Sequence, residues 1–245
     1  MGSVIVVTSG KGGTGKTSLT GGVGSALALQ GHKVLCIDGD VGLRNLDITL
    51  GMSDAALMDF SDVIAGWCEL SRAVAPHPSI SDLYLLTSPL TLPGEFPGES
   101  GFRTLLQQAR EAYDYILIDS PAGLGEGFRL AACDADRAIV VAVSDPSSLR
   151  DAQRVVSQLQ HMQTVHLVVN RVRGRVLRRL GTTIDDAMDT AGLPLLGLVP
   201  EDTRVVLAAG KGRALLQLSQ RGAAQAYGNI ARRIAGETVP LMKIY

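Results

Sequence analysis

Residues 9–17 read SGKGGTGKT, a glycine-rich loop that follows the apolar run Val4–Thr8 and opens the helix-like segment Lys16–Gln30. This spacing is the P-loop pattern, in which glycines let the backbone turn tightly and point successive amide N–H groups inward. The helix adds the positive end of its dipole, which favours a bound phosphate. The loop therefore predicts a nucleotide site. Its expected members are Gly10, Gly12, Gly13, Thr14, Gly15, Lys16, Thr17 and Ser18.

Two side chains at the start of the helix have separate predicted roles. Lys16 would neutralise charge on the β- and γ-phosphates, and the Thr17 hydroxyl is the kind of oxygen ligand that Mg²⁺ prefers. The same glycines also fit G-x-G-x-x-G, with Asp38 following Gly15 by 23 residues, as in a nicotinamide-dependent oxidoreductase. Lysine and threonine at the helix start have no role in that fingerprint, and Lys11 adds a second cation to the loop, so we favour the phosphate loop.

Acidic residues end two later apolar runs. Asp38 and Asp40 stand at the end of Lys33–Asp38, and Asp119 ends Tyr115–Asp119. Parallel strands bring their C-terminal ends to the edge of the sheet where ligands bind. Asp119 therefore has the place of a Walker B acid that holds the Mg²⁺ shell, while Asp38 and Asp40 would order metal-bound or attacking water. The alternatives are a solvated Asp-Gly turn and a helix-capping aspartate.

The rest of the chain alternates short apolar runs with longer amphipathic stretches. Unalternated, β-branched runs are typical of strands covered on both faces, and repeated β–α alternation predicts a mostly parallel central sheet flanked by helices on both faces, the three-layer P-loop NTPase fold. We expect one domain over 1–245, with a long surface loop at Pro89–Gly101. The remaining expected strands are Leu83–Thr87, Ala138–Ser144, His166–Asn170 and Leu195–Val199, and the remaining expected helices are Phe102–Tyr113, Ser147–His161 and Thr183–Ala191.

Composition sets broad limits on location and partners. The 245 residues carry 23 Lys+Arg and 24 Asp+Glu, a net charge of −1, so no global attraction to nucleic acid or anionic membrane is indicated. Cys36, Cys68 and Cys133 lack metal-ligand spacing and fit thiols in a reducing cytosol. The N-terminus has no secretory signal pattern, and no apolar stretch reaches about 18 residues, the minimum for a membrane span. We expect a cytoplasmic protein.

Several motifs together resemble one family. The loop with Lys11 is similar to the deviant Walker A motif of the MinD/ParA ATPases, which include flagellar-placement ATPases and iron–sulfur carriers. The stretch DGDVGLRNLD over 38–47 and DSPAG over 119–123 look specifically like the MinD members. Val169–Arg171 and Val199–Asp202 resemble the family's two adenine-site segments. The similarity runs from about residue 3 to about residue 235, and the RNLD segment is its most discriminating part.

The resemblance implies roles for individual residues. Lys11 would reach across an ATP-bound homodimer to the partner's phosphates, and Asp40 would position the hydrolytic water. Asp38, Asp119 and Thr17 would surround the Mg²⁺ that accompanies ATP or ADP. Switch I would span 38–47, switch II with the Walker B strand 115–123, and regulators would dock at Ser148–Arg154. The adenine would lie against Asn170, Arg171, Pro200, Glu201 and Asp202.

The implied function is an ATP-dependent switch. Such an ATPase turns over slowly, is stimulated by a partner, and positions the division site by recruiting a division inhibitor and an activating regulator, of the MinC and MinE kind, to the membrane. The alternatives within the family are DNA partition and flagellar placement. An arginine group at 171, 173, 175, 178 and 179 would serve non-specific DNA binding, or is a solvated helix face. No C-x-x-C supports an iron–sulfur carrier, and no specific nucleic acid is expected.

Three positions depart from the family's pattern. Thr14 replaces a valine, and Gly125 stands where a glutamate is usual, although Glu126 is adjacent. MinD proteins commonly end in a basic amphipathic helix that lies in the membrane interface. Here the tail 236–245 is too short for one and carries one cation. Either the chain is truncated, or it associates weakly with the inner face of the membrane through dimer avidity or a partner.

Overall fold

The computed structural model describes residues 1–53, 55, 57–91, 98–160, 162 and 164–244. Within these residues, eight strands form one sheet in the order β3-β4-β2-β5-β1-β6-β7-β8, and all neighbours are parallel except β3 with β4. The strands are β1 Ser3–Thr8, β2 Val34–Asp38, β3 Ala75–Pro76, β4 Leu83–Leu86, β5 Tyr115–Asp119, β6 Arg137–Val143, β7 Thr164–Val172 and β8 Leu195–Pro200.

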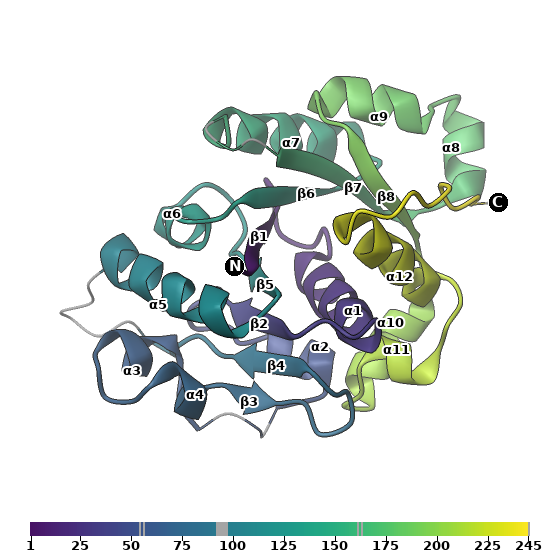
Figure 1. Ribbon diagram of the computed structural model, residues 1–245. Helices are drawn as coiled ribbons and strands as arrows, with labels where there is room; N and C mark the ends of the chain where they lie inside the picture. Colours follow the sequence, from purple (N-terminus) through teal and green to yellow (C-terminus); the bar gives the residue numbers. More distant parts are fainter. Residues whose placement is uncertain (54, 56, 92–97, 161, 163, 245) are drawn as a thin grey trace.

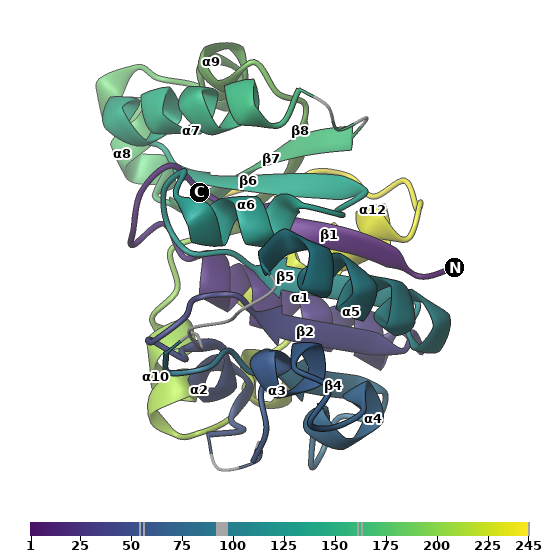
Figure 2. The ribbon, with the colours of Figure 1, turned by 90° about the vertical axis from the view of Figure 1, so that its left-hand side faces the viewer.

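Helices cover both faces of the sheet (Figure 1), which confirms the expected three-layer architecture. One face packs against α1 Lys16–Leu29, α2 Leu46–Leu50, α10 Thr203–Gly210, α11 Leu215–Leu218 and α12 Ala223–Ile234. The other face, turned to the viewer in Figure 2, packs against α3 Phe60–Ile64, α4 Leu70–Ala73, α5 Gly98–Ala112, α6 Glu126–Ala132, α7 Pro146–Gln158, α8 Gly174–Leu180 and α9 Ile184–Ala191.

Strand β2 shows why the apolar runs lack alternation. All five of its residues are buried. Leu35 and Ile37 join the hydrophobic cluster on one face of the sheet, and Val34 and Cys36 join the cluster on the other. Side chains point to opposite faces along a strand, so a strand covered twice must be apolar at every position. The uninterrupted runs thus encode a buried parallel sheet.

Helix α1 lies unusually close to its neighbours because it carries glycines. A Cβ at Gly22 would come within 2.1 Å of the Tyr227 ring on α12, and a Cβ at Gly24 within 2.4 Å of Cys36 Sγ on β2. Glycine lowers helix propensity by about 1 kcal/mol relative to alanine, so these positions exchange intrinsic stability for close packing. The result fixes the helix that follows the glycine-rich loop against both the sheet and α12.

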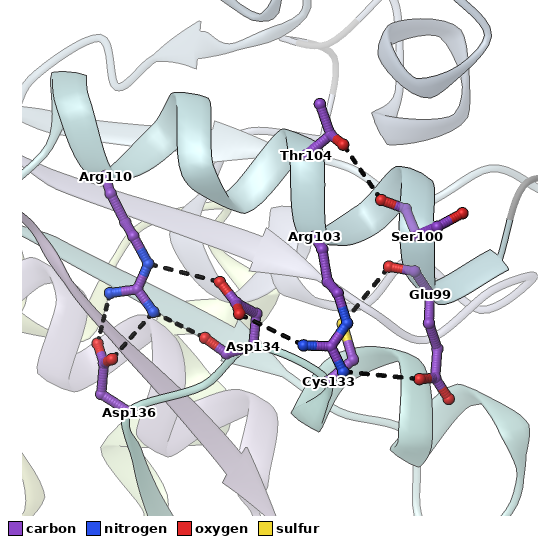
Figure 3. Close-up of polar contacts among 8 residues, drawn as sticks. All are labelled: Glu99, Ser100, Arg103, Thr104, Arg110, Cys133, Asp134 and Asp136. Carbon is purple, nitrogen blue, oxygen red and sulfur yellow. Dashed lines mark hydrogen bonds and ion pairs between the residues drawn. The ribbon is translucent and has the colours of Figure 1, made fainter.

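Arg110, near the end of α5, ties that helix to the turn between α6 and β6 (Figure 3). Its guanidinium donates to Asp136 at 2.6 and 3.0 Å and to the Asp134 carbonyl at 2.7 Å, and it also reaches the Gly2 carbonyl at 2.9 Å. These hydrogen bonds raise the pKa of Arg110. The network joins the N-terminus and two layers on the side of the sheet away from the loop.

Most expected elements are present, with shifted ends. The predicted loop Pro89–Gly101 is wrong at its end, because α5 begins at Gly98, four residues before the predicted start at Phe102. Residues 92–97 of that loop lie outside the described part of the chain, as does His161 in the predicted helix Ser147–His161, where α7 ends at Gln158. The short helices α2, α3, α4, α6, α8, α10 and α11 and the strand β3 were not predicted.

The C-terminal stretch packs on the fold without forming a helix. Arg233 on α12 donates to the carbonyls of Leu196, Val239 and Pro240 at 2.8 to 3.2 Å. Ile244 packs against the hydrophobic core. Among the described residues, no helix combines the length and apolar character needed to cross a bilayer. The three cysteines are free thiols.

Candidate functional site

The glycine-rich loop connects β1, in the middle of the sheet, to the buried helix α1. Gly13 and Gly15 have φ of +78° and +90°, the left-handed region that favours glycine. A Cβ at Gly15 would also lie 2.3 Å from Asn170 Nδ2, and one at Gly10 would lie 2.4 Å from the Asp151 carbonyl oxygen on α7. Gly12 and Gly13 have open space around the Cβ position, so their backbone is accessible to a ligand.

Lys16 is the first residue of α1 and its side chain is buried in the loop, with the residue 8% exposed. Burial lowers the pKa of Lys16, and the negative charges of Asp119 and Asp40 oppose that effect. Both carboxylates attract the buried ammonium group, although within the described residues neither forms an ion pair with it. The loop, together with Lys16 and these acids, forms a cradle that holds a buried cation before any anion binds.

Asp38 and Asp119 end neighbouring strands, and their Cα atoms are paired in register. Asp38 is 1% exposed and accepts hydrogen bonds from the amides of Asp40 at 2.9 Å and Leu46 at 3.0 Å. Burial raises the pKa of Asp38. Its carboxylate thus holds the backbone of residues 40–46 as well as contributing charge to the site.

Asp119 is the most perturbed acid of the site. Burial, helped by the nearby Asp38 charge, raises its pKa to about 7, although a hydrogen bond from the Thr17 side chain lowers it. A nearby cation stabilises the ionised form of a carboxyl group whose burial makes ionisation costly. Carboxylates and a hydroxyl are also the hard oxygen donors that suit Mg²⁺. The residues present therefore fit a magnesium ion, although no ready-made group of three ligands occurs within the described residues.

Asp40 lies at the open side of the cradle, where it is half-buried. Burial raises the pKa of its carboxyl group and the Lys16 charge lowers it. The backbone around Asp40 is held by the Ser88 hydroxyl, which donates to the Asp40 carbonyl at 3.1 Å. Its carboxylate thus reaches solvent beside the cradle, a position suited to orienting water.

Backbone hydrogen bonds link the segment 119–123 to β1 and the loop, and link Gly39 to that segment. The Ser120 amide donates to the Val7 carbonyl at 3.0 Å, the Gly123 amide to the Ser9 carbonyl at 3.2 Å, and the Gly39 amide to the Asp119 carbonyl at 2.9 Å. The loop is thus connected directly to the segment 119–123, and through Asp119 to Gly39.

Arg44 in switch I has φ of +42°, a conformation that costs free energy for a residue with a side chain. Its guanidinium donates to the Ser88 carbonyl at 2.5 Å and pairs with Asp59 at 3.2 Å. These contacts hold the strained backbone. The RNLD stretch indicated a functional segment, but it gave no sign of the Asp59 partner.

Lys11 points away from the cradle of its own subunit. Its Nζ lies 3.1 and 3.3 Å from the two carboxylate oxygens of Asp145 and 3.3 Å from Ser147 Oγ. Asp145 also caps α7 by accepting from the Ser148 amide at 2.9 Å. Burial raises the pKa of Asp145, but the hydrogen bonds from Ser148 and Lys11 outweigh it and lower the pKa. Asp145 and Ser147 were not predicted; Asp-Pro after an apolar run signals a helix start, but not a lysine partner.

The expected adenine-site residues fall into two groups. The Asn170 side chain is buried and donates to the Thr14 carbonyl at 2.7 Å, which ties the end of β7 to the loop. An asparagine amide has a second N–H, which stays available to a ligand. Arg171 follows in a left-handed conformation, with φ of +52°.

The Pro200–Asp202 segment is occupied by structural contacts. Glu201 forms an ion pair with Arg173, one of whose hydrogen bonds measures 2.6 Å. The Asp202 carboxylate caps α10 through the Arg204 amide at 3.0 Å and accepts from the Ala223 amide at 2.9 Å. Asp202 therefore joins α10 to α12, and its carboxylate is committed to the fold.

Glu126, the acid next to the unusual Gly125, does not join the cradle. It begins α6, its side chain is 96% exposed, and it pairs with Arg129 at 3.7 Å. The structure thus brings together the loop, Lys16, Thr17 and the three aspartates. It connects Asn170 to the loop through Thr14, whose hydroxyl is buried without a hydrogen-bond partner among the described residues.

Comparisons with known proteins match this geometry. The family model of the CobQ/CobB/MinD/ParA nucleotide binding domain matches residues 5–216. The septum site-determining protein MinD of Bacillus subtilis is 37% identical over 246 residues, which cover 98% of this chain and 92% of that protein. The MinD of Synechocystis sp. is 37% identical over 99% of this chain and 92% of its own length.

Solved structures give the same result. The MinD cell division protein of Aquifex aeolicus has a TM-score of 0.89 at 35% identity, covering 98% of this chain and all of that one. MinD from Pyrococcus horikoshii, solved as a complex with Mg-ADP, has a TM-score of 0.83 at 30% identity and covers 96% of both chains. A MinC:MinD complex from Aquifex aeolicus also matches, with a TM-score of 0.89. The chain therefore belongs to the CobQ/CobB/MinD/ParA family of nucleotide-binding proteins, and within it to the MinD group of septum site-determining proteins.

Proposed function

We propose that this chain is a slow, partner-stimulated ATPase that dimerises around Mg-ATP and helps to position the division site. The observation that carries the proposal is the opposite placement of the two loop lysines. Lys16 is buried beside Asp119 and Asp40, whereas Lys11 lies outside the cradle on Asp145. One lysine thus serves the subunit's own nucleotide, and the other is available to a second subunit.

Within one subunit, the loop amides and the N-terminus of α1 would bind the phosphates, with Lys16 neutralising their charge. Thr17, and Asp38 and Asp119 through water, would hold Mg²⁺, which supplies charge neutralisation on the phosphates when bound. Asp40, at the open side of the cradle, would orient the attacking water. Asn170 and Arg171 would contact the adenine, with backbone from Pro200–Asp202 beside it.

Between subunits, Lys11 would exchange one anionic partner for another. In the separate chain it is bonded to Asp145, and in the dimer it would be bonded to the neighbour's phosphates. Loss of the γ-phosphate would weaken the second contact and return Lys11 to Asp145. Asp145 caps α7, so this exchange occurs next to Ser148–Arg154, where regulators would dock. A partner that binds one state more tightly than the other turns the cycle into a switch.

The expected partners follow from the MinD group. Aquifex aeolicus MinD has been solved with MinC, and we propose that a division inhibitor of this kind binds the dimer of this chain. An activating regulator would compete for the same edge and stimulate hydrolysis. Recruitment to the membrane would place the inhibitor where division must be blocked. We also propose that residues 1–245 act as one domain.

Size analysis with ATP or ADP tests the switch. Wild type should dimerise with Mg-ATP and stay monomeric with Mg-ADP. Asp40→Ala should keep the ATP dimer longer, because the water is no longer oriented. Lys11→Ala should bind nucleotide and stay monomeric. If wild type stays monomeric with ATP and Asp40→Ala does not favour the dimer, the switch is wrong.

A further inference from the structure

Helix α8 carries an unusual surface: three exposed arginines beside two exposed apolar side chains, Arg175, Val176, Arg178, Arg179 and Leu180. We call these five residues the α8 surface. Val176 is 42% exposed and Leu180 is 66% exposed. Leu177 turns inward instead and packs against the hydrophobic core. Gly174 is also buried, so the helix packs through Gly174 and Leu177 and exposes the five residues of the α8 surface.

Helical spacing arranges the α8 surface into rows. Val176 and Leu180 are four residues apart and share one row, and Arg175 and Arg179 share the next. Ion pairing does not explain the arginines. Arg173, just before the helix, pairs with Glu201, but within the described part of the chain no carboxylate lies within ion-pair distance of Arg175, Arg178 or Arg179. Among the described residues, three arginines of one short helix thus lack a carboxylate partner and lie beside two exposed apolar side chains.

The surroundings extend this surface on one side and limit it on the other. In Figures 1 and 2 the end of the chain lies beside α8, after the stretch that Arg233 holds through the Val239 and Pro240 carbonyls. That end carries Leu241, which is 51% exposed, and Lys243. On the other side α9 begins with exposed Asp185 and Asp186, which an anionic partner would avoid.

We infer that the α8 surface, continued by the chain end at Leu241, is a contact site for an anionic phospholipid bilayer. Arginines pair with lipid phosphates while their stems and the neighbouring apolar row enter the interface, which is the chemistry of a membrane-surface helix. A nucleic acid would use the arginines but would leave Leu180 exposed to phosphates and water, so the apolar row favours lipid over DNA. The inference rests on the membrane part of the proposed function and identifies the surface and lipid class.

Vesicle co-sedimentation tests the assignment with the full chain. Vesicles contain either phosphatidylglycerol with phosphatidylcholine or phosphatidylcholine alone, and Mg-ATP is present throughout. The variants are Arg178→Ala/Arg179→Ala and Leu180→Ser. The matched control is Arg72→Ala/Arg213→Ala, which removes two exposed arginines that lie in α4 and in the turn between α10 and α11.

Wild type and the control should bind the anionic vesicles and bind phosphatidylcholine far less. The double arginine variant should lose about 25-fold in apparent affinity, since one cation near an anionic surface contributes about fivefold. Leu180→Ser should lose less, and it should keep the salt dependence of binding. ATP-dependent dimerisation should be unchanged in all three variants, which shows that they are folded and that the switch is intact.

Three outcomes would overturn the assignment. If both α8 variants bind like wild type, the surface is wrong while membrane recruitment stands. If wild type dimerises with ATP but ignores anionic vesicles, the membrane part of the function fails and the α8 surface with it. If the arginine variant loses binding to random duplex DNA, keeps vesicle binding, and Leu180→Ser changes neither, the surface binds nucleic acid.

Discussion

The two lysines of the loop are five residues apart and have opposite environments. Lys16 is 8% exposed and lies beside Asp119 and Asp40. The Lys11 side chain is 34% exposed and is bonded to Asp145, on a different layer of the molecule. Lys16 is held by its burial at the start of α1, whereas an exposed ion pair such as Lys11–Asp145 is worth only about 0.2–1 kcal/mol. One loop thus carries a fixed cation and an exchangeable one.

Lys16→Ala tests the role of the buried lysine and should have the largest effect. Removing the buried ammonium leaves Asp119 and Asp40 facing incoming phosphates with no opposing charge. Hydrolysis should fall by about 10³-fold, and nucleotide affinity should fall with it. Phosphate release and equilibrium nucleotide binding measure the two losses. Lys11→Ala is the comparison, and equal loss of nucleotide affinity in both variants would remove the distinction between the lysines.

Asp119→Asn sharpens the account of the buried acids through pH. The pKa of Asp119 is raised from 3.8 to about 7, so in the absence of metal and nucleotide its ionisation opposes folding as pH rises through that interval. Between pH 6 and pH 8 this group should lower the free energy of unfolding by about 1 kcal/mol. Asparagine does not titrate, so the variant should not show this fall in the free energy of unfolding.

Urea denaturation of both proteins at the two pH values checks the prediction. Added Mg²⁺ and nucleotide should reverse the loss of wild-type stability with rising pH, because a cation stabilises the ionised carboxylate. In the variant, which lacks this carboxylate, they should leave the pH dependence of stability unchanged. The same pH dependence in both proteins would show that Asp119 is not the titrating group.

Asp145→Asn tests the ion pair between Asp145 and the exposed Lys11, and it should have a smaller effect. Asparagine caps a helix about as well as aspartate, so α7 should keep its start while Lys11 loses its charged partner. Lys11 would then leave more easily, and the ATP dimer should tighten by about two- to fivefold. Sedimentation equilibrium with Mg-ATP measures the change. A weaker dimer in Asp145→Asn would contradict the exchange.

Glu126→Gln should have the smallest effect. The side chain is 96% exposed and forms an ion pair with Arg129, itself 59% exposed. Surface changes of this kind usually stay within about 0.5 kcal/mol. Hydrolysis with and without a stimulating partner should therefore change by less than about twofold. A large loss of stimulated activity alone would mean that Glu126 enters the site when the partner binds.

The layers of the fold were predictable because burial on both faces imposes an unmistakable pattern. Strands such as β2 must be apolar at every position, and the loop fixes where β1 ends and α1 begins. The start of α5 was not predictable, because the glycines at 98 and 101 and the prolines before them signal a loop. The helix is set instead by packing of Phe102 and Leu105 in the core.

The same distinction between what local sequence predicts and what packing sets applies to the site. The motif pointed to Lys16, Thr17 and Asp119, and the structure brings them together. The motif did not indicate that Asp202 joins α10 to α12, or that Asn170 donates to Thr14. Those contacts join residues far apart along the chain, and no local spacing carries that information. The roles of these residues toward a nucleotide stay predictions.

The sheet, the loop and the family could be inferred from the sequence, because strand burial and backbone turning are encoded in short runs of residue types. The partner of Lys11 could be learned only from the fold, since Asp145 reaches it by the pairing of β1 with β6 across more than a hundred residues. The fold also shows that the α8 arginines lie beside the exposed Leu180. Charge pairing depends on distances in space, and the fold sets those distances.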